Sequence, residues 1–266
     1  MKDQIVKFLA YDGKILVTCA STTQLVEEAR KVHDLSPLAT AVMGRVLTIT
    51  SLIGSEMKNK TDKLTIQIKG NGPIGKIVAV SDNTPHVKAC VTNPVVDLPL
   101  NEFEKLDVGG AVGNHGFINV IKDIGLKEPY IGISPLTSGE IADDFANYFQ
   151  TSEQKQTAVA LGVLVDKDGV RSSGGYIISP MPDATEEEIS KVKEVVEAVG
   201  GTCEKQADGS VKVYVHGIPA HAAFPEGSES AEVKMAGLLK KSGVLDEDAA
   251  NLMDAICEMF GDYYGA

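Results

Sequence analysis

The chain has 266 residues, of which 43% are hydrophobic, and its formal net charge at neutral pH is −12. This length and apolar content suffice for a packed core in one large or two small domains, and they exclude a wholly disordered chain. Because an acidic surface repels phosphate groups, we expect neither a nucleic-acid partner nor a membrane partner.

The cysteines are scattered along the chain, at Cys19, Cys90, Cys203 and Cys257. No two of them form a C-x-C or C-x-x-C pair, the spacing typical of zinc ligands. We therefore expect no metal site, no disulfide framework and no cofactor, with each thiol acting as a small buried hydrophobe. The first ten residues lack an apolar run of signal-peptide length. Together these features predict a cytoplasmic protein.

The N-terminal residues predict a hairpin followed by a helix. Two apolar runs, 5–10 and 15–20, flank an Asp-Gly dipeptide at Gly13, which is a strong hairpin signal because glycine tolerates positive φ. Ser21 is followed three residues later by a glutamine, the pattern of a capping box. This pattern predicts a helix from Ser21 to about His33.

The most apolar stretch is 36–57, which is long enough to suggest a membrane span. Arg45 lies near its centre, however, and a charge at that depth is unfavourable in lipid. We predict a buried helix with Ser36 as N-cap and Pro37 at its first position. Such a helix is apolar nearly all round, so it requires cover from a sheet or from a partner chain. The second possibility suggests a dimer.

From residue 63 onward the spacing of apolar residues changes to that of strands. Three runs bounded by Gly, Asn or Pro predict a meandering sheet, namely LTIQIKG, GPIGKIVAVSD and HVKACVTNP. Two further strand pairs are predicted at 116–123 with 128–133 and at 159–165 with 175–178. Between these pairs, Ser138 predicts the start of a helix that continues to Thr151.

The C-terminal part predicts a smaller αββα unit. An amphipathic helix is expected at 185–199, two strands at 202–206 and 210–216, and helical segments at 228–241 and 246–263. The whole chain is therefore predicted to be α+β. We expect a domain at 1–182 with a meandering sheet and packed helices, followed by a linker helix and small unit at 183–266.

Several segments of the first 180 residues resemble the core of one family, the redox-regulated heat-shock holdases known as 33 kDa chaperonins. They include YDGKILVTCASTTQLVEEAR, GRVLTITSLIGSEMK, KLTIQIKGNGPIGKIVA, KLDVGGAVG, SGEIADDFANYFQTSEQ and SSGGYIISPMPDAT. The resemblance implies a cytosolic, stress-linked, ATP-independent chaperone that binds unfolding client proteins, commonly as a homodimer. In this family, a linker and a zinc domain with C-x-C and C-x-x-C ligands cover the client surface until oxidation. This chain has no such motif, so no zinc ligand is carried over and the redox switch is expected to be absent.

The C-terminal part resembles a different family. VYVHGIPAHAAFPEGSESA and DAICEMFGDYYG are similar to the lid domain of zinc aminoacylases and dipeptidases, which suggests a fusion. His221 matches the lid histidine that contacts a substrate carbonyl oxygen, although Ser230 replaces an expected asparagine. No H-x-D ligand pair of the metal-binding domain is present, so hydrolysis is not expected. We regard His221 as a weak oxyanion-type candidate, with a plain loop histidine as the favoured interpretation.

Other candidate sites have simpler explanations. The run Gly70–Gly75 lacks the Lys-Ser/Thr ending of a phosphate loop and predicts a hairpin turn. Asp143 and Asp144 are adjacent on a predicted helix, where neighbours point about 100° apart, so we expect a solvated face. The pair Gly174-Gly175 indicates a bulge or a close backbone approach.

We predict no catalytic and no metal-binding residues, and the sequence does not identify the client-binding residues. The leading hypothesis is a non-enzymatic holdase that binds clients through an apolar surface. The alternative is a peptidase-related substrate-binding or dimerisation module without a catalytic metal. A third possibility is an inactive fusion whose C-terminal part only packs on the core.

Overall fold

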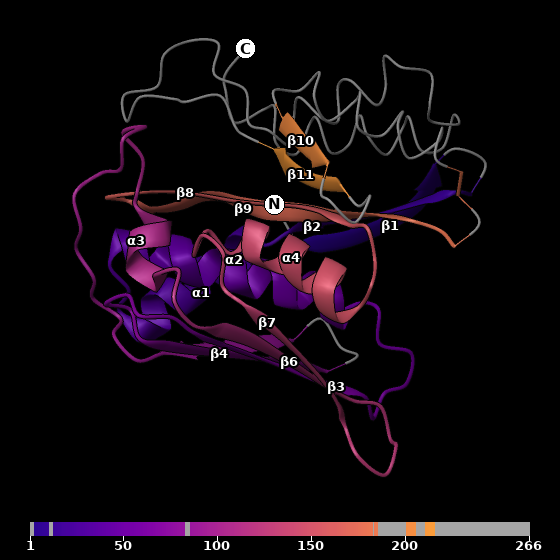
Figure 1. Ribbon diagram of the computed structural model, residues 1–266. Coiled ribbons are helices and arrows are strands. Elements are labelled where there is room, and N and C mark those ends of the chain that lie inside the picture. The colour runs from indigo at the N-terminus through magenta and orange to yellow at the C-terminus, as the bar shows by residue number, and fades with distance from the viewer. Residues whose placement is uncertain are drawn as a thin grey trace, which may run out of the picture.

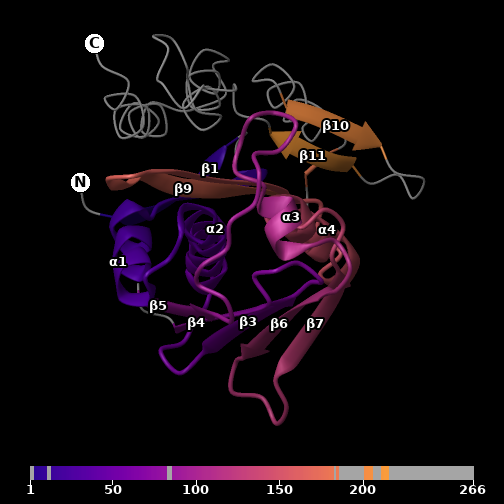
Figure 2. The same ribbon diagram turned by 90° about the vertical axis from the view of Figure 1, so that its left-hand side faces the viewer.

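The computed structural model describes residues 3–10, 13–82, 86–182, 184–185, 201–205 and 211–215. In this part of the chain, four helices lie between a four-stranded and a five-stranded antiparallel sheet (Figures 1 and 2). A separate two-stranded hairpin lies beyond the four-stranded sheet. The predicted α+β class is confirmed.

The four-stranded sheet has the order β1-β2-β9-β8, formed by Gln4–Ala10, Ile15–Ser21, Gly169–Pro180 and Ala158–Asp166. The five-stranded sheet has the order β5-β4-β3-β6-β7, formed by Val87–Val91, Lys76–Asp82, Lys63–Lys69, Phe117–Asp123 and Tyr130–Pro135. The separate hairpin consists of β10 (Gly201–Lys205) and β11 (Val211–Val215). The predicted N-terminal hairpin, meander, later strand pairs and C-terminal strands are confirmed, with small shifts at their ends.

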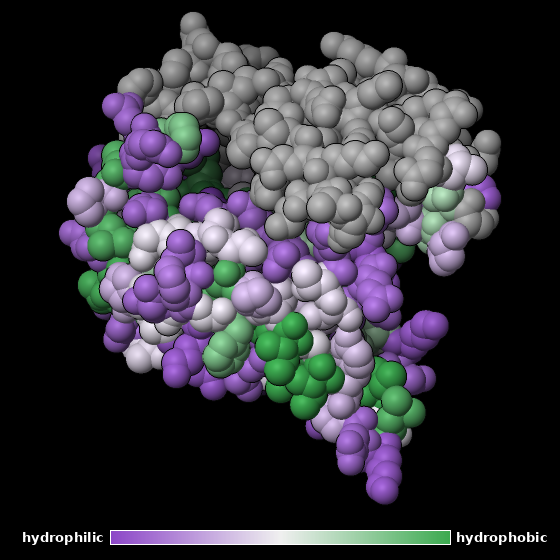
Figure 3. Space-filling view, viewed as in Figure 1, coloured by the Kyte–Doolittle hydropathy of each residue, from purple (hydrophilic) through white to green (hydrophobic). Residues whose placement is uncertain are grey.

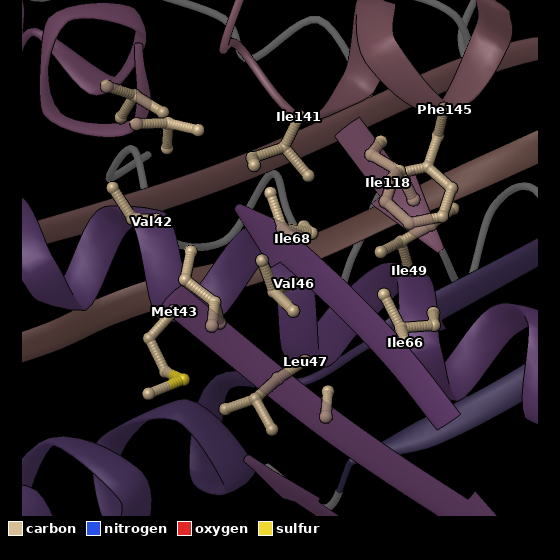
Figure 4. Close-up of a cluster of buried hydrophobic side chains, with 14 of the residues drawn as sticks. Val42, Met43, Val46, Leu47, Ile49, Ile66, Ile68, Ile118, Ile141 and Phe145 are labelled. Carbon is tan, nitrogen blue, oxygen red and sulfur yellow. The ribbon is translucent and has the colours of Figure 1, made fainter. Parts of the chain in front are cut away.

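The central element is α2 (Pro37–Gly54), which contacts strands of both sheets. Its predicted start is confirmed, because the Ser36 side chain accepts a hydrogen bond from the Ala39 N–H at 3.4 Å and Pro37 occupies the first position. Figure 4 shows its side chains among those of β3, β6 and the segment around α4 (Ala142–Ser152). The cover that this apolar helix requires is therefore supplied by its own chain.

Buried hydroxyl groups on α2 are satisfied within the helix. The Oγ1 atoms of Thr48 and Thr50 donate to the carbonyls of Gly44 and Val46, at 2.8 and 2.6 Å. These bonds back to the preceding turn allow a polar side chain to lie in an apolar layer without an orphaned donor. Thr48 also contacts the Thr22 hydroxyl at 2.6 Å, and this bond links α2 to the end of β2.

Among the described residues, α2 alone is long and apolar enough to cross a membrane, and 89% of its apolar window is buried inside the protein. A core helix passes this test of length and composition as readily as a membrane span does. The expectation of a buried helix is therefore confirmed.

Two predicted helix starts are wrong. Ser21 is the last residue of β2, and α1 (Thr23–His33) begins after Thr22, whose side chain makes no capping bond. The carboxylate of Asp3 instead accepts hydrogen bonds from the N–H groups of Gln24 and Leu25, at 3.0 and 2.7 Å. A residue from the beginning of the chain thus satisfies the free donors at this helix end.

The second wrong start concerns Ser138, since α4 begins only at Ala142. The carboxylate of Asp144 accepts hydrogen bonds from the N–H groups of Thr137 and Ser138, at 2.6 and 3.0 Å, and from the N–H of Ile141 at 3.3 Å. Asp144 is fully buried, so the solvated face predicted for this residue is also wrong. The carboxylate organises the turn that precedes the helix.

The glycine-rich run at residues 70–75 is a turn between β3 and β4, as predicted. Gly72 N–H donates to the Val112 carbonyl at 2.9 Å, and Ile74 N–H donates to the Ala111 carbonyl at 3.1 Å, so the turn lies against α3 (Val108–Val112). A Cβ atom at Gly72 would lie 2.3 Å from the Ala111 carbonyl oxygen. Only glycine permits this close approach of two backbones.

Glu27 joins α1 to the turn between β8 and β9. Its carboxylate accepts hydrogen bonds from Arg30 Nε at 2.8 Å and from the Val170 N–H at 3.0 Å. Hydrogen bonding by the Arg30 guanidinium is the main reason that the pKa of the Glu27 carboxyl is lowered from 4.5 to about 2.

We expect Asp144→Ala to lower the free energy of unfolding by about 3 kcal/mol, because a buried carboxylate that accepts from three N–H groups, one of them on buried Ile141, is removed. Urea unfolding followed by circular dichroism measures this change. The neighbouring Asp143→Ala, at a half-buried position, serves as control and should cost less than about 1 kcal/mol. Equal losses in the two variants would contradict the role assigned to Asp144.

We expect Glu27→Gln to destabilise the protein in a pH-dependent way. Because the folded-state pKa of Glu27 is lowered, its stabilisation is present above pH 4.5 and is lost as the pH falls toward 2. After allowance for solvent screening, the difference from the parent chain should be about 1 to 2 kcal/mol at pH 6 and near zero at pH 2. Glu28→Gln removes the same charge from an exposed position on α1, and its effect should stay small at every pH.

Candidate functional site

The four-stranded sheet has apolar side chains on both of its faces. Ala20, Val159 and Ile177 belong to the core cluster around α2, so these positions face the helices. Lys7 also faces that side, because its Nζ donates to the Ser55 carbonyl just after α2. Successive residues of a strand point to opposite faces, so the alternate positions point away from the helix layer.

Strand register aligns these alternate positions in rows across the sheet. Val17 of β2 pairs with Ile178 of β9, which pairs with Ala158 of β8. The adjacent row contains Cys19, Tyr176 and Ala160. We call this surface the outer face; it includes Val6, Ile15, Val17, Cys19, Ala158, Ala160, Tyr176 and Ile178.

The outer face is buried although it points away from the core. Val17, Tyr176 and Ile178 are only 3 to 4% exposed, yet none of them belongs to the cluster around α2. The hairpin of β10 and β11 lies on this side of the sheet, and β11 runs against β8 and α4 (Figures 1 and 2). The described hairpin of β10 and β11 therefore lies over the β8 side of this apolar sheet surface.

Close backbone packing is built into the same sheet. A Cβ atom at Gly175 would lie 2.4 Å from the Ala160 carbonyl oxygen, which confirms the expected close approach at this glycine pair. The register shift in the sheet lies elsewhere, between Leu164 and Val165 of β8. Gly175 thus serves the packing of the sheet.

Cys19 lies near the middle of the outer face, between Val6 of β1 and Tyr176 of β9. Burial raises the pKa of its thiol to about 12. The thiolate is the reactive form of cysteine, so the raised pKa lowers the reactivity of the half-buried Cys19 thiol. Cys90 is exposed, and it lies on β5 of the other sheet.

A zinc site of the kind implied by the resemblance does not fit the described residues. Cys19 and Cys90 belong to different sheets on opposite sides of the helix layer, so their sulfur atoms cannot share a metal ion. The described residues contain no group of three or more His, Cys, Asp or Glu side chains that could hold one. His221 and Cys257 lie outside the described residues, as does the side chain of Cys203.

Sequence reasoning did not identify the outer face. The signal lay in the runs ILVTCAS, AVALGVLVD and GYIIS, which are apolar at both odd and even positions. Strands with this pattern are buried on both faces. The pattern does not reveal which part of the chain covers the second face, because that contact is not local.

Comparisons with known proteins agree with this architecture. The family model described as Hsp33 protein matches residues 3–218, past residue 182 and through both strands of the C-terminal hairpin. The 33 kDa chaperonin of Thermoanaerobacter sp. (strain X514) is 50% identical over 205 residues, which are 77% of this chain and 70% of the relative. The protein of the same name from Ruminiclostridium cellulolyticum is 51% identical over 193 residues, which are 73% of this chain and 66% of the relative.

A solved structure is also similar. The crystal structure of the 33 kDa chaperonin from Thermotoga maritima superimposes with a TM-score of 0.69 at 31% identity, over 97% of this chain and 98% of that one. The suggested relation of the C-terminal part to an aminoacylase lid is not shown by these comparisons and stays a prediction. The chain belongs to the Hsp33 family of heat-shock chaperones, and it is a chaperone rather than an enzyme.

Proposed function

We propose that this chain is an ATP-independent holdase that binds unfolding proteins on the outer face of its four-stranded sheet. One observation carries the proposal: an apolar face points away from the core and is buried, and the hairpin of β10 and β11 lies on that side of the sheet. Displacement of this cover would leave an apolar surface for exposed segments of a client. A holdase needs such a surface and no catalytic group.

The cover and a client would compete for the same apolar surface, and the stability of the cover supports this proposal. Burial of one large aliphatic side chain stabilises a contact by about 1.5 to 3 kcal/mol, so covering Val17 and Ile178 is strongly favourable. A lone two-stranded hairpin, in contrast, is marginally stable in water. We infer that β10 and β11 depend on the outer face for their stability, and that heat releases them before it melts the core.

Independence of ATP is supported by the turn at residues 70–75. The N–H groups of Gly72 and Ile74 donate to the carbonyls of α3. A phosphate loop needs backbone N–H groups that are directed at its ligand. In this turn, the two N–H groups bond to protein instead.

Regulation would differ from that implied for the family. Cys19 and Cys90 lie on different sheets, and the sequence has no C-x-C or C-x-x-C pair. We propose that loosening of the cover, and not loss of zinc, exposes the outer face. The division at residue 182 would then separate a chaperone core from its cover.

Location and oligomeric state form part of this proposal. Scattered cysteines are consistent with a reducing cytoplasm. The homodimer implied by the resemblance remains a proposal as well. It receives no support from α2, because the two sheets of the same chain cover that helix.

We expect the full chain to suppress the thermal aggregation of a client such as citrate synthase without ATP. Suppression should be equal in reductant and in peroxide, because the sequence lacks the paired-cysteine motif. Light scattering of the client at several chaperone ratios measures both expectations. Failure to suppress aggregation under any condition would refute the holdase, while a large gain in peroxide would reveal an unforeseen thiol switch.

We expect the reactivity of Cys19 to report on the cover. In a variant with Cys90→Ser, Cys203→Ser and Cys257→Ser, alkylation should be slow at low temperature, because the thiol pKa of about 12 leaves little thiolate. On uncovering, the pKa falls toward 9.0 and the rate should rise by up to about a thousandfold.

The rise in Cys19 alkylation should begin at the temperature at which aggregation suppression begins. A variant that keeps only Cys90 is the control, since that thiol is exposed throughout and should show an ordinary temperature dependence. Suppression that begins while Cys19 remains unreactive would place client binding away from the outer face.

A further inference from the structure

The segment between β5 and α3 presents large apolar side chains to solvent. We call residues 97–107 the 97–107 loop. Leu100 is 55% exposed and Phe103 is 62% exposed. Single exposed apolar residues are common on proteins, whereas two of them in one short loop form a small apolar patch.

The 97–107 loop is held in one conformation by its own hydrogen bonds. The side-chain carbonyl of Asn101 accepts from the N–H groups of Phe103 and Lys105, both at 3.0 Å. The backbone of Asn101 also donates to the Lys105 carbonyl at 2.8 Å, and Glu104 adopts a positive φ of 56° to close the turn. Phe103 is therefore displayed by an ordered turn at low entropic cost to a binding partner.

Both ends of the 97–107 loop are anchored to the helix layer. The Ser36 hydroxyl donates to the Val96 carbonyl at 2.8 Å and accepts from the Val96 N–H at 3.1 Å. At the other end, the Asp107 carboxylate accepts from the Gly110 N–H at 2.8 Å and caps α3. The position of the loop is thus tied to α2 and α3, independently of the cover.

The 97–107 loop lies beside the outer face. In Figures 1 and 2 it rises from the helix layer past the level of the four-stranded sheet, on the side of β10 and β11. Figure 3 shows hydrophobic surface among hydrophilic atoms at the upper left, over this loop. An apolar segment bound on the outer face could therefore extend to Leu100 and Phe103.

The charges of the 97–107 loop are mostly negative. It carries four carboxylates, at Asp97, Glu102, Glu104 and Asp107, and one ammonium, at Lys105. Glu102 and Glu104 flank Phe103 directly, and both are exposed. Carboxylates next to an apolar anchor favour a partner with cationic groups on either side of its apolar residues.

We propose that the 97–107 loop is a second client contact that selects apolar segments flanked by lysine or arginine. This inference rests on the proposed holdase function, and it specifies which segments that surface prefers. Leu100 and Phe103 bind the apolar residues, and the carboxylates around them attract the flanking cations. Continuity with the outer face allows one extended client segment to use both surfaces.

The apolar part of this proposal is tested with Leu100→Thr/Phe103→Thr in the full chain. The matched control is Ile131→Thr/Ile133→Thr, because those side chains are 54% and 62% exposed on β7 of the opposite sheet. We expect the loop variant to need about fivefold more protein for half-suppression of client aggregation. The control should match the parent, and urea unfolding should show both variants to be folded.

The charge preference is tested with two labelled peptides that share an apolar centre and carry either lysine or glutamate flanks. At low salt, the parent should bind the lysine-flanked peptide about three- to tenfold more tightly than the other. Asp97→Lys/Glu102→Lys should reverse this preference. Equal binding of both peptides to the parent would overturn the proposed selectivity.

The remaining outcomes separate this proposal from its rivals. If the loop variant no longer self-associates but still suppresses client aggregation, the 97–107 loop binds a second copy of the chain. If Cys19 is alkylated faster in that variant before heating, the loop binds the chain's own cover. Either result overturns the proposal. If the parent chain suppresses no aggregation, both the holdase function and the role of the 97–107 loop are refuted. If the parent is active and the loop variant is equally active, only the role of the loop is refuted.

Discussion

The fold depends on one constraint, which is that α2 is apolar nearly all round and must be enclosed. A single sheet can cover only one side of a helix, so two sheets are required, and strands β1 to β9 form two sheets on either side of α2. Arg45 remains compatible with this enclosure because it pairs with Glu140 at the margin, at 2.5 Å. The three-layer architecture follows from the need to enclose this helix.

The need to enclose α2 does not explain why the four-stranded sheet is apolar on both faces. The inner positions of its strands complete the core, but the outer positions are equally apolar, although a sheet that faced water would carry polar residues there. The five-stranded sheet shows the ordinary arrangement on β3, where Lys63, Thr65 and Lys69 lie outside and isoleucines lie inside. Ile131 and Ile133 of β7 are nevertheless exposed on that sheet, so the feature that supports the proposed assignment of client binding is the burial of the outer face, and not its apolar composition alone.

Much of the fold could be predicted from local patterns, because alternation and turn residues are encoded within a few positions. The hairpin at Gly13, the meander and the N-terminus of α2 belong to this group. The capping of α1 and α4 could not be predicted, since Asp3 acts from a distant part of the chain and nothing local distinguishes the inward Asp144 from Asp143. The outer face was missed for the same reason, because its cover comes from strands that follow after residue 200.

The position of β9 has a consequence for the folding of the newly made chain. This strand pairs with β2 on one side and β8 on the other, so it completes the sheet although about 150 residues separate it from β2. Until β9 leaves the ribosome, β2 presents an unpaired edge and its apolar outer positions to other nascent chains. Such distant pairing slows folding. During its own synthesis, this chaperone therefore passes through a state with exposed apolar surface and an unpaired strand edge, the features that make incompletely folded chains aggregate.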